Sequence, residues 1–365
     1  MEQQHHGGDR YRNHILYDAS VNVNPLGMPE AVIRRLQDTM LYWSRYPDCR
    51  CQALCRALEE FHQIKAGQVL CGNGAADLIW RLCARMKFKR GLVLAPTFSE
   101  YEAALLAFGS RADRFFLKEE NGFQPDMDEL CQAAAGHDAV FFCNPNNPTG
   151  VLTKRSQLER LARACQEQGA YLIVDECFNG LCDEPEEASM VPLLDSYPNL
   201  LILNAFTKTY GMAGLRLGYL MGADLALLED LSRAGQPWSV SYPAQEAGAA
   251  ALTARNYIKE SRALIRKEKT YLEQELAGMG FSVYPSQSNF LLFSADAERR
   301  GEASPAFLYQ QMKKRGILIR DCRSFAGLGA GFYRICVGKG PDNQFLMRIM
   351  RGEEMHEFIS DHSGR

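Results

Sequence analysis

The chain of 365 residues lacks the features that direct a protein to a membrane, to secretion or to nucleic acid. No apolar run approaches the roughly 20 residues that a membrane-spanning helix requires. Residues 1–10 are polar and contain no apolar signal core. The net charge of −3 favours neither nucleic acid nor a membrane surface as a partner. We therefore expect a cytoplasmic protein with no membrane partner and no nucleic-acid partner.

The pattern of a metal site is also missing, although the chain has twelve cysteines. They cluster only at Cys49, Cys51 and Cys55, and no second ligand pair follows at the spacing of a zinc site. Because a signal peptide is lacking, we expect reduced thiols and no disulfide framework. If this segment is helical, Cys51 and Cys55 share a face, which suits packing.

The chain does contain an alternation of short apolar runs with helical patterns. The runs are Val69–Cys71, Gly91–Ala95, Ala139–Cys143, Tyr171–Val174, Leu200–Leu203 and Leu217–Met221. The helical patterns include Ala75–Arg85, Glu100–Phe108 and Leu152–Glu167. Strands that are almost wholly apolar are typical of a sheet covered on both faces. The alternation predicts an α/β fold with a doubly wound parallel sheet.

After about residue 255 the pattern changes to that of a second, smaller domain. A charged helical stretch at 255–278 comes first. Strand-like segments follow at 281–284, 289–293, 317–319 and 333–337, with a helix near 306–315. We interpret residues 41–265 as the large domain and 266–365 as a small α+β domain, which residues 1–40 join as an N-terminal arm.

Polar or glycine-rich loops follow five of the predicted strands. They are Gly72–Asp77, Pro96–Tyr101, Asn144–Gly150, Asp175–Phe178 and the segment from Asn204 to Gly218. Ligands of such sheets bind beyond the carboxyl ends of the strands, so we expect one shared crevice there.

Lys208 and Arg216 in the last of these loops suggest a cofactor. A lysine amine condenses with aldehydes, and the guanidinium fork of arginine binds phosphate. Pyridoxal 5'-phosphate (PLP) carries both groups, so one short loop would hold it at both ends. Taken alone, Lys208 would be an exposed loop lysine and Arg216 a surface ion-pair partner.

Other loops offer further cofactor contacts, each with a purely structural alternative. Backbone N–H groups of Gly74, Ala75 and Ala76 at a helix start would bind phosphate, although such turns are common. Asp175 would keep a pyridine nitrogen protonated, or would only cap a helix. The loops at 144–150 and 96–101 offer two more contacts. Asn147 would donate to the phenolic oxygen or serve the turn alone, and Phe98, or less plausibly Tyr101, would stack on the ring or belong to the core.

Three arginines near the C-terminus are candidates for binding an anionic substrate. Arg334 lies in a strand-like run and is the candidate for a substrate carboxylate, which favours a fork donor. Arg320 and Arg323 add positive charge nearby. The alternative for all three is solvated surface.

Together these residues resemble the fold-type I PLP-dependent enzymes, the class I/II aminotransferase superfamily, over nearly the whole chain. The resemblance implies PLP as cofactor and a mostly parallel seven-stranded sheet in an α/β/α sandwich, with a small α+β domain. It also implies a homodimer with active sites at the interface. Tyr46 matches a tyrosine that reaches the cofactor phosphate of the other subunit.

The same resemblance implies roles for individual residues. Lys208 would be the internal aldimine lysine and Asp175 the partner of the pyridine nitrogen. Asn147 would donate to O3′, Arg216 would bind the phosphate, and Arg334 would bind the substrate carboxylate. Two positions depart from the usual pattern. Phe178 replaces a tyrosine that bonds to O3′, and Ala205 replaces a hydroxyl residue, so Thr207, Tyr46 and backbone donors would have to compensate.

Two subgroups fit best: threonine-phosphate decarboxylases of cobalamin biosynthesis and histidinol-phosphate aminotransferases. Segments that favour the decarboxylases include His6–Asp9, Ser20–Gly27, Pro96–Tyr101, Pro237–Val240 and Ile319–Gly327. The turn Gly211–Gly214 looks more like that of the aminotransferases. We expect an enzyme that acts on a phosphate-bearing α-amino acid through an external aldimine, as a decarboxylase or alternatively as an aminotransferase.

We further expect Arg320 and Arg323 to hold the distal phosphate of the substrate, with His6 and Asn24 of the arm closing over it. Two other classes of protein remain as alternatives. A PLP-sensing regulator would carry a DNA-binding extension, and the polar start offers no room for a helix-turn-helix. A cofactor-free scaffold is less favoured still.

Overall fold

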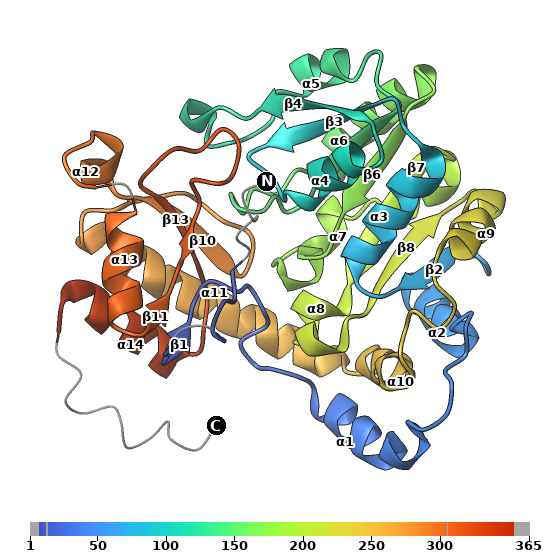
Figure 1. Cartoon of the computed structure of the whole chain (residues 1–365), viewed down its shortest axis with the longest axis horizontal. Helices are drawn as coiled ribbons and strands as arrows, with labels where there is room; N and C mark the ends of the chain where they lie inside the picture. The colour runs from blue at the N-terminus through green and yellow to red at the C-terminus, as the bar shows by residue number, and fades with distance from the viewer. Residues whose placement is uncertain (1–6, 12–13, 305, 354–365) are drawn as a thin grey trace.

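The computed structural model describes residues 7–11, 14–304 and 306–353, and these form two parts built on separate sheets (Figure 1). The larger sheet has seven strands in the order β2-β8-β7-β6-β5-β3-β4. They are β2 (Val69–Gly72), β3 (Arg90–Ala95), β4 (Arg111–Phe116), β5 (Ala139–Cys143), β6 (Tyr171–Asp175), β7 (Leu200–Ala205) and β8 (Gly218–Gly222). Only β8 runs antiparallel to its neighbours, so the predicted mostly parallel, seven-stranded sheet is confirmed.

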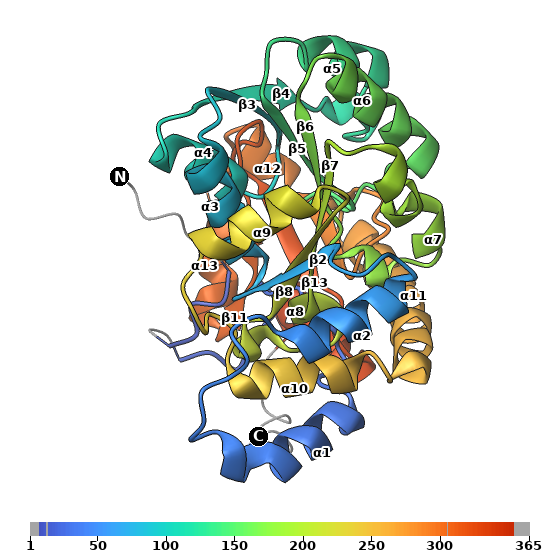
Figure 2. The same cartoon turned by 90° about the vertical axis from the view of Figure 1, so that its right-hand side faces the viewer.

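Helices cover both faces of this sheet because its strands are apolar on both sides. Along β6, Leu172 and Val174 pack into one core and Ile173 into the other. The helices α3 (Ala75–Met86), α4 (Glu100–Ala107) and α9 (Leu225–Ala234) cover one face. The other face is covered by α2 (Gln52–His62), α5 (Met127–Ala133), α6 (Arg155–Glu167) and α10 (Tyr242–Ala251). The resulting α/β/α sandwich is seen along its layers in Figure 2.

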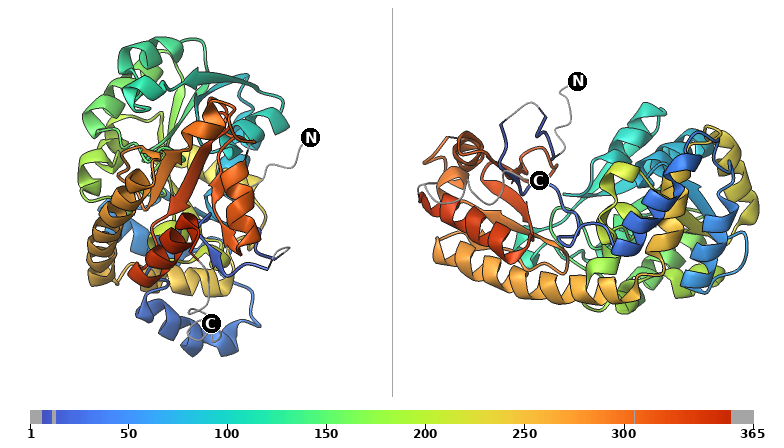
Figure 3. Two further views of the ribbon diagram at one scale, coloured as in Figure 1. Left: turned by 90° about the vertical axis from the view of Figure 1, so that its left-hand side faces the viewer. Right: turned by 90° about the horizontal axis from the view of Figure 1, so that it is seen from below.

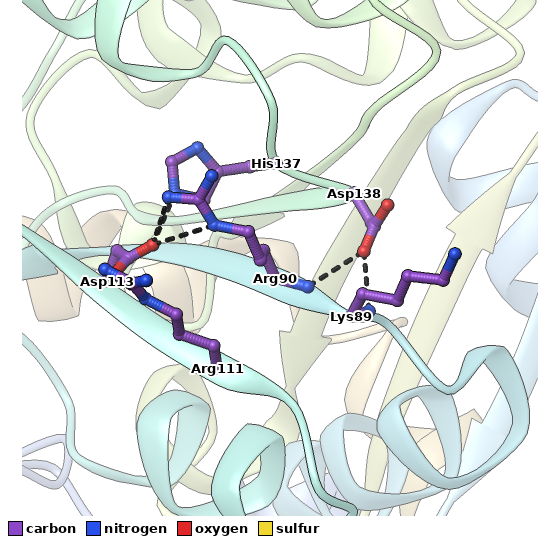
Figure 4. A network of polar contacts seen from close by, with 6 residues as sticks. All are labelled: Lys89, Arg90, Arg111, Asp113, His137 and Asp138. Carbon is purple, nitrogen blue, oxygen red and sulfur yellow. Dashed lines mark hydrogen bonds and ion pairs between the residues drawn. The ribbon is translucent and has the colours of Figure 1, made fainter.

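The edge strand β4 is the one strand of the large sheet that the apolar runs did not reveal. Half of its residues are charged, and its side chains are exposed or half-buried, as is common for edge strands. Its Asp113 accepts from Arg90 Nη2 at 2.7 Å and Arg111 Nε at 2.8 Å, and His137 Nε2 lies 3.1 Å away (Figure 4). Charge pairs to the neighbouring β3 thus help to hold an edge that has few apolar contacts.

The smaller sheet is antiparallel, in the order β12-β13-β10-β9. Its strands are β9 (Ser282–Val283), β10 (Phe290–Ser294), β12 (Arg320–Asp321) and β13 (Phe332–Cys336). The helices in this part are α11 (Arg255–Gly278), α12 (Asp296–Arg299), α13 (Phe307–Lys314) and α14 (Gly340–Arg351). Figure 3 shows α11 running beside both parts of the molecule, which ties them together.

The N-terminal arm contacts both parts. Its strand β1 (Tyr17–Asp18) pairs in parallel with β11 (Ile317–Leu318) in the small part. Its helix α1 (Glu30–Thr39) packs instead against α10 of the large part. The whole arm was expected to join the small domain. Residues 30–39 lie instead on the large part, because α1 packs its apolar side against α10. The exact domain boundaries stay predictions.

The remaining short helices are α7 (Pro185–Ala188) and α8 (Phe206–Thr209), and α8 follows β7 directly. Within the described residues, no helix has both the length and the apolar character needed to cross a bilayer.

Candidate active site

Lys208 lies in α8, immediately beyond the carboxyl end of β7. Its side chain is half-buried, and its Nζ lies 5.3 Å from the centre of the Phe178 ring. Burial, and next the positive charge of Arg334, lower the pKa of this amine to about 8. A larger fraction of the amine is therefore neutral near pH 7 than in an exposed lysine, which suits a nucleophile.

Asp175 lies at the carboxyl end of β6 and is buried. Its Oδ2 accepts a 2.5 Å hydrogen bond from the Tyr101 hydroxyl, and its Oδ1 accepts from the backbone N–H of Cys177 at 2.9 Å. Burial, and next the charge of Asp175, raise the pKa of Tyr101, which keeps its hydroxyl a donor. These two bonds orient the carboxylate.

Tyr101 therefore does not have the stacking role that was considered for it. Its ring is fully buried and stacks on Phe141 with centroids 5.4 Å apart. Phe98 meets Tyr101 edge-on at 5.6 Å and is only half-buried, so stacking by Phe98 stays a prediction.

Two glycines bring Arg216 against the start of α3. Gly74 precedes this helix with a φ of +82°, and no side chain in the described part of the chain caps the helix. A Cβ on Gly74 would lie 2.6 Å from Arg216 Nη2, and one on Gly218 would lie 2.5 Å from the backbone nitrogen of Ala75. Only glycine leaves room at either place. The first N–H groups of α3, from Ala75 and Ala76, and the Arg216 guanidinium thus form a cradle that fits a phosphate.

Arg334 is buried in β13, and its partners in the described part of the chain are neutral oxygens. Its Nη1 donates to the side-chain oxygen of Asn147, and its Nη2 donates to the carbonyl of Ser20 at 2.9 Å. The Asn22 amide, turned so that its oxygen faces the guanidinium, accepts from Nε at 3.1 Å. Burial lowers the pKa of Arg334 to about 10, and it remains a cation at neutral pH. A buried cation with only neutral partners favours an anionic ligand.

Arg320 and Arg323, both predicted to hold a distal phosphate, have different surroundings. Arg320 lies directly opposite Arg334 in the ladder between β12 and β13, and its Nη2 donates to Ser324 Oγ at 2.8 Å. Arg323 is exposed, and its Nε donates to Asp321 Oδ2 at 2.8 Å. The structure thus brings Arg320 next to Arg334, while Arg323 already has an acidic partner.

Asn24 and His6 were predicted to close over the same phosphate. The side-chain nitrogen of Asn24 donates to the Thr209 carbonyl and to Ser261 Oγ, both at 2.8 Å. Its backbone N–H donates to the Lys208 carbonyl at 3.1 Å. Asn24 therefore fastens the arm to α8, and a contact with substrate would have to break these bonds. His6 lies outside the described residues.

Four more residues that the sequence singled out have these positions. Phe178 is buried edge-on against Phe290, with centroids 5.1 Å apart. Thr207 is half-buried in α8, next to Lys208, and Ala205 is buried at the end of β7. Tyr46 is 79% exposed, and its ring centre lies 4.6 Å from that of Trp238.

The sequence reasoning missed the residues that hold the catalytic groups in place. Tyr101 was considered for stacking on the cofactor ring, whereas its hydroxyl holds Asp175. Neither Ser20 nor Asn22 was proposed as a partner of Arg334. One signal was present in the sequence. Ser20, Asn22 and Asn24 alternate with apolar or small residues, which places three polar groups on one side of an extended segment, and all three are buried.

The family model described as aminotransferase class I and II matches residues 16–348. This chain belongs to the class I and II aminotransferase family. A threonine-phosphate decarboxylase from Salmonella typhimurium is 34% identical to this chain over 337 residues. The match covers 92% of this chain and 90% of that protein. A histidinol-phosphate aminotransferase from Desulfitobacterium hafniense (strain Y51) is also 34% identical to this chain. The match covers 90% of this chain and 89% of that protein.

A solved structure agrees with the fold of this family member. The histidinol-phosphate aminotransferase from Clostridium acetobutylicum superimposes with a TM-score of 0.85 at 28% identity, covering 92% of this chain and 98% of that one. The family member is therefore an enzyme of PLP fold type I, and its cofactor is PLP, as the sequence predicted. The cradle, the buried carboxylate and the lysine of low pKa fit that cofactor.

Proposed function

We propose that this enzyme decarboxylates threonine phosphate or a closely similar α-amino acid with a phosphate on its β-carbon. The observation that carries the proposal is the placement of Arg320 directly opposite the buried Arg334. Cβ atoms of such cross-strand neighbours lie about 5 Å apart, which suits two anionic groups on adjacent carbons. The similarity to the Salmonella typhimurium decarboxylase supports the same substrate class.

Each side chain of the site then has a task. Arg334 binds the substrate carboxylate with its fork, and Arg320, with Ser324, binds the phosphate. Arg216 and the start of α3 would hold the cofactor phosphate, and the Asp175 carboxylate, oriented by Tyr101, would stabilise a protonated ring nitrogen. Bound PLP supplies an electron sink for the bond that breaks at the α-carbon. Lys208 Nζ delivers the proton that replaces the departing carboxylate.

An aminotransferase of the histidinol-phosphate type is the second candidate. The Desulfitobacterium hafniense relative has the same sequence identity of 34%. The turn at residues 211–214 also resembles that of this subgroup. The two reactions differ in the bond that is held perpendicular to the cofactor ring, which depends on how Arg334 orients the substrate.

Two incubations of the purified enzyme with PLP separate the candidates. O-phosphothreonine should release CO2 in a one-to-one ratio with the amine product. Histidinol phosphate with 2-oxoglutarate should give no glutamate. Unphosphorylated threonine is the matched control, and its kcat/KM should be about 10- to 100-fold lower because the phosphate contact is lost. Glutamate formation without CO2 release would establish the aminotransferase instead.

We also propose that the enzyme is a homodimer. Large apolar side chains are exposed together on residues 40–46 and at Trp238, including Leu41 at 85% and Tyr46 at 79%. An apolar patch of this kind favours a protein interface. In the dimer, Tyr46 would reach the phosphate cradle of the other subunit. Light scattering should give twice the chain mass, and Leu41→Glu should give monomers that bind PLP weakly.

We propose a cytoplasmic location. All twelve cysteines are free, even though Cys55 Sγ lies only 3.7 Å from Cys71 Sγ. Such a pair is expected to stay reduced in a reducing compartment. Fractionation of cells that express the enzyme, followed by immunodetection, tests this location.

A further inference from the structure

Three thiols meet between α2 and β2, just before the cradle for the cofactor phosphate. Cys55 Sγ lies 3.7 Å from Cys71 Sγ, and Cys51, whose thiol donates to the Asp48 carbonyl at 3.8 Å, lies close enough to affect the pKa of Cys71. Cys51 and Cys55 flank the first turn of α2, whereas Cys71 lies in β2. Packing, the role predicted for Cys51 and Cys55, explains why these side chains point inward. Packing alone does not explain why their thiols lie beside a third thiol.

The two closest thiols differ in reactivity. A hydrogen bond from Cys71 lowers the pKa of Cys55 and outweighs the opposing effects of burial and nearby carboxylates. The hydrogen bonds with Cys51 and Cys55, together with burial, raise the pKa of Cys71. Cys55 is thus the better thiolate, and Cys71 stays a protonated neighbour.

Small reagents have a route to this group. A cavity of about 270 Å³ is lined by Cys49, Cys51 and Cys71, together with Arg50 and Arg81. Cys55 itself is half-buried. The pair therefore combines a reactive thiolate, a resolving thiol and an opening to solvent, as in redox-sensing cysteines.

We propose that Cys55 and Cys71 are an oxidisable pair, and that closing a disulfide between them loosens the cofactor phosphate cradle. With a peroxide as oxidant, the Cys55 thiolate attacks one peroxide oxygen, which forms a sulfenic acid and releases water after protonation. The Cys71 sulfur then displaces the hydroxyl group, which leaves with a proton as a second water. Two thiols lose two hydrogens in total, hydrogen peroxide gains them, and a thiol reductant reverses the change.

The position of Cys71 couples this bond to the cofactor. Gly72 and Asn73 alone separate Cys71 from Gly74, where the cradle begins. A disulfide requires the sulfurs to approach from 3.7 Å to about 2 Å, which pulls the end of β2 toward α2. The cradle has little slack, because the Gly218 backbone packs so closely on the start of α3 that a Cβ there would lie 2.5 Å from the Ala75 nitrogen. Oxidation should therefore weaken PLP binding, and bound PLP should slow oxidation by the same coupling.

Peptide mapping of the full-length holoenzyme tests the bond. After brief treatment with hydrogen peroxide and alkylation of free thiols, mass spectrometry should find a peptide that joins Cys55 to Cys71 and separates on reduction. Alkylation of the untreated enzyme should be at least about tenfold faster at Cys55 than at Cys71. Finding no such peptide, or one that joins Cys51 to Cys71, would overturn the assignment.

Single variants sharpen the test. Cys71→Ser should leave a sulfenic acid on Cys55 that dimedone traps, and Cys55→Ser or Cys55→Ala should abolish the linked peptide. Cys49→Ser is the matched control, because Cys49 is exposed and lines the same cavity. It should oxidise like the wild type. Retained PLP absorbance shows that each variant is folded.

The coupling has its own measurement, which does not depend on turnover. Oxidised and reduced enzyme are passed through a desalting column, and the PLP that remains bound is measured by absorbance. Oxidation should increase the rate of PLP release about fivefold or more, and apoenzyme should oxidise faster than holoenzyme by a similar factor. Equal PLP release from both forms would contradict the coupling to the cradle.

Discussion

The large sheet carries a cluster of charged groups at each end of its strands, and the two clusters differ in what shifts their pKa values. At the amino ends, Asp113 is surrounded by Arg90, Arg111 and His137, and hydrogen bonds from these partners lower its pKa to about 2 (Figure 4). At the carboxyl ends, burial lowers the pKa of Lys208 to about 8. The first shift moves titration away from neutral pH, and the second moves it closer.

This difference separates a cluster that stabilises from one that reacts. The acid at the amino ends has basic partners within hydrogen-bonding distance and partial access to water. In the reacting cluster, Arg334 is buried among neutral oxygens, and the Lys208 amine faces an aromatic ring. Charges whose protein partners are neutral retain the capacity to bind a ligand.

The largest expected effect is that of removing the reacting amine. Lys208→Ala should abolish covalent attachment of PLP and lower kcat by at least about 10³-fold, because nucleophile and proton carrier are both lost. The absorbance of the bound cofactor and its resistance to dialysis check the attachment. Lys154→Ala, at an exposed lysine, is the control and should leave both properties unchanged.

Replacement of the buried guanidinium should come next. Arg334→Lys keeps the charge but removes the fork, so we expect kcat/KM to fall about 100-fold while PLP stays bound. Arg323→Ala is the comparison, because Arg323 is exposed and paired with Asp321. If Arg323→Ala lowers activity equally on phosphorylated and unphosphorylated substrates, Arg323 has no role in phosphate binding.

The pKa of Lys208 predicts how the apoenzyme reacts with added PLP. The neutral amine is the nucleophile, so the rate of attachment should rise about tenfold from pH 7 to pH 9, with a midpoint near 8. Stopped-flow absorbance measures this rate. A midpoint near the value of 10.5 for an ordinary lysine would show that burial does not activate this amine.

A smaller effect is expected where a side chain acts through another one. Tyr101→Phe removes the 2.5 Å bond to Asp175 and leaves the ring in the core, so kcat should fall about tenfold with little loss of stability. The absorbance of bound PLP as a function of pH should shift as well. An unchanged spectrum with unchanged kcat would reduce Tyr101 to a packing residue.

The smallest effect on activity should come from the amino-end cluster. Because the carboxyl pKa of Asp113 is lowered to about 2 from 3.8, the native state gains stability above about pH 4 and loses it as the pH falls toward 2. Asp113→Asn should therefore lower the urea midpoint at pH 7 more than at pH 3. PLP binding should not change, and weaker binding would mean that the two clusters communicate.

The sequence predicted the apolar strands of the fold better than its charged or very short ones. The strands β5, β6 and β7 are apolar on both faces, which makes them recognisable as runs. The charged edge strand β4 and the two-residue β12 offer no such run, and only pairing defines them.

The site shows a similar limit. Asp175 ends β6, Lys208 follows β7, and Arg216 precedes the antiparallel β8, so their meeting at one edge of the sheet could be expected from topology. The Tyr101 bond to Asp175 joins residues 74 positions apart, and the partner of Arg334 at Ser20 is a backbone carbonyl, which any residue would supply. Arg323 and Asp321, by contrast, are only two positions apart, so their pairing could have been predicted from the sequence.

The path of the N-terminal arm also sets an order of events during synthesis on the ribosome. The arm emerges first, yet Ser20 meets Arg334 across 314 residues, and Asn24 meets Thr209 and Ser261 across 185 and 237. The large sheet is complete at Gly222, long before β13 is translated. A nascent chain can thus assemble its central layers early. Its substrate carboxylate pocket, however, takes shape only when translation is almost finished, so fragments that end before β13 are released without this pocket.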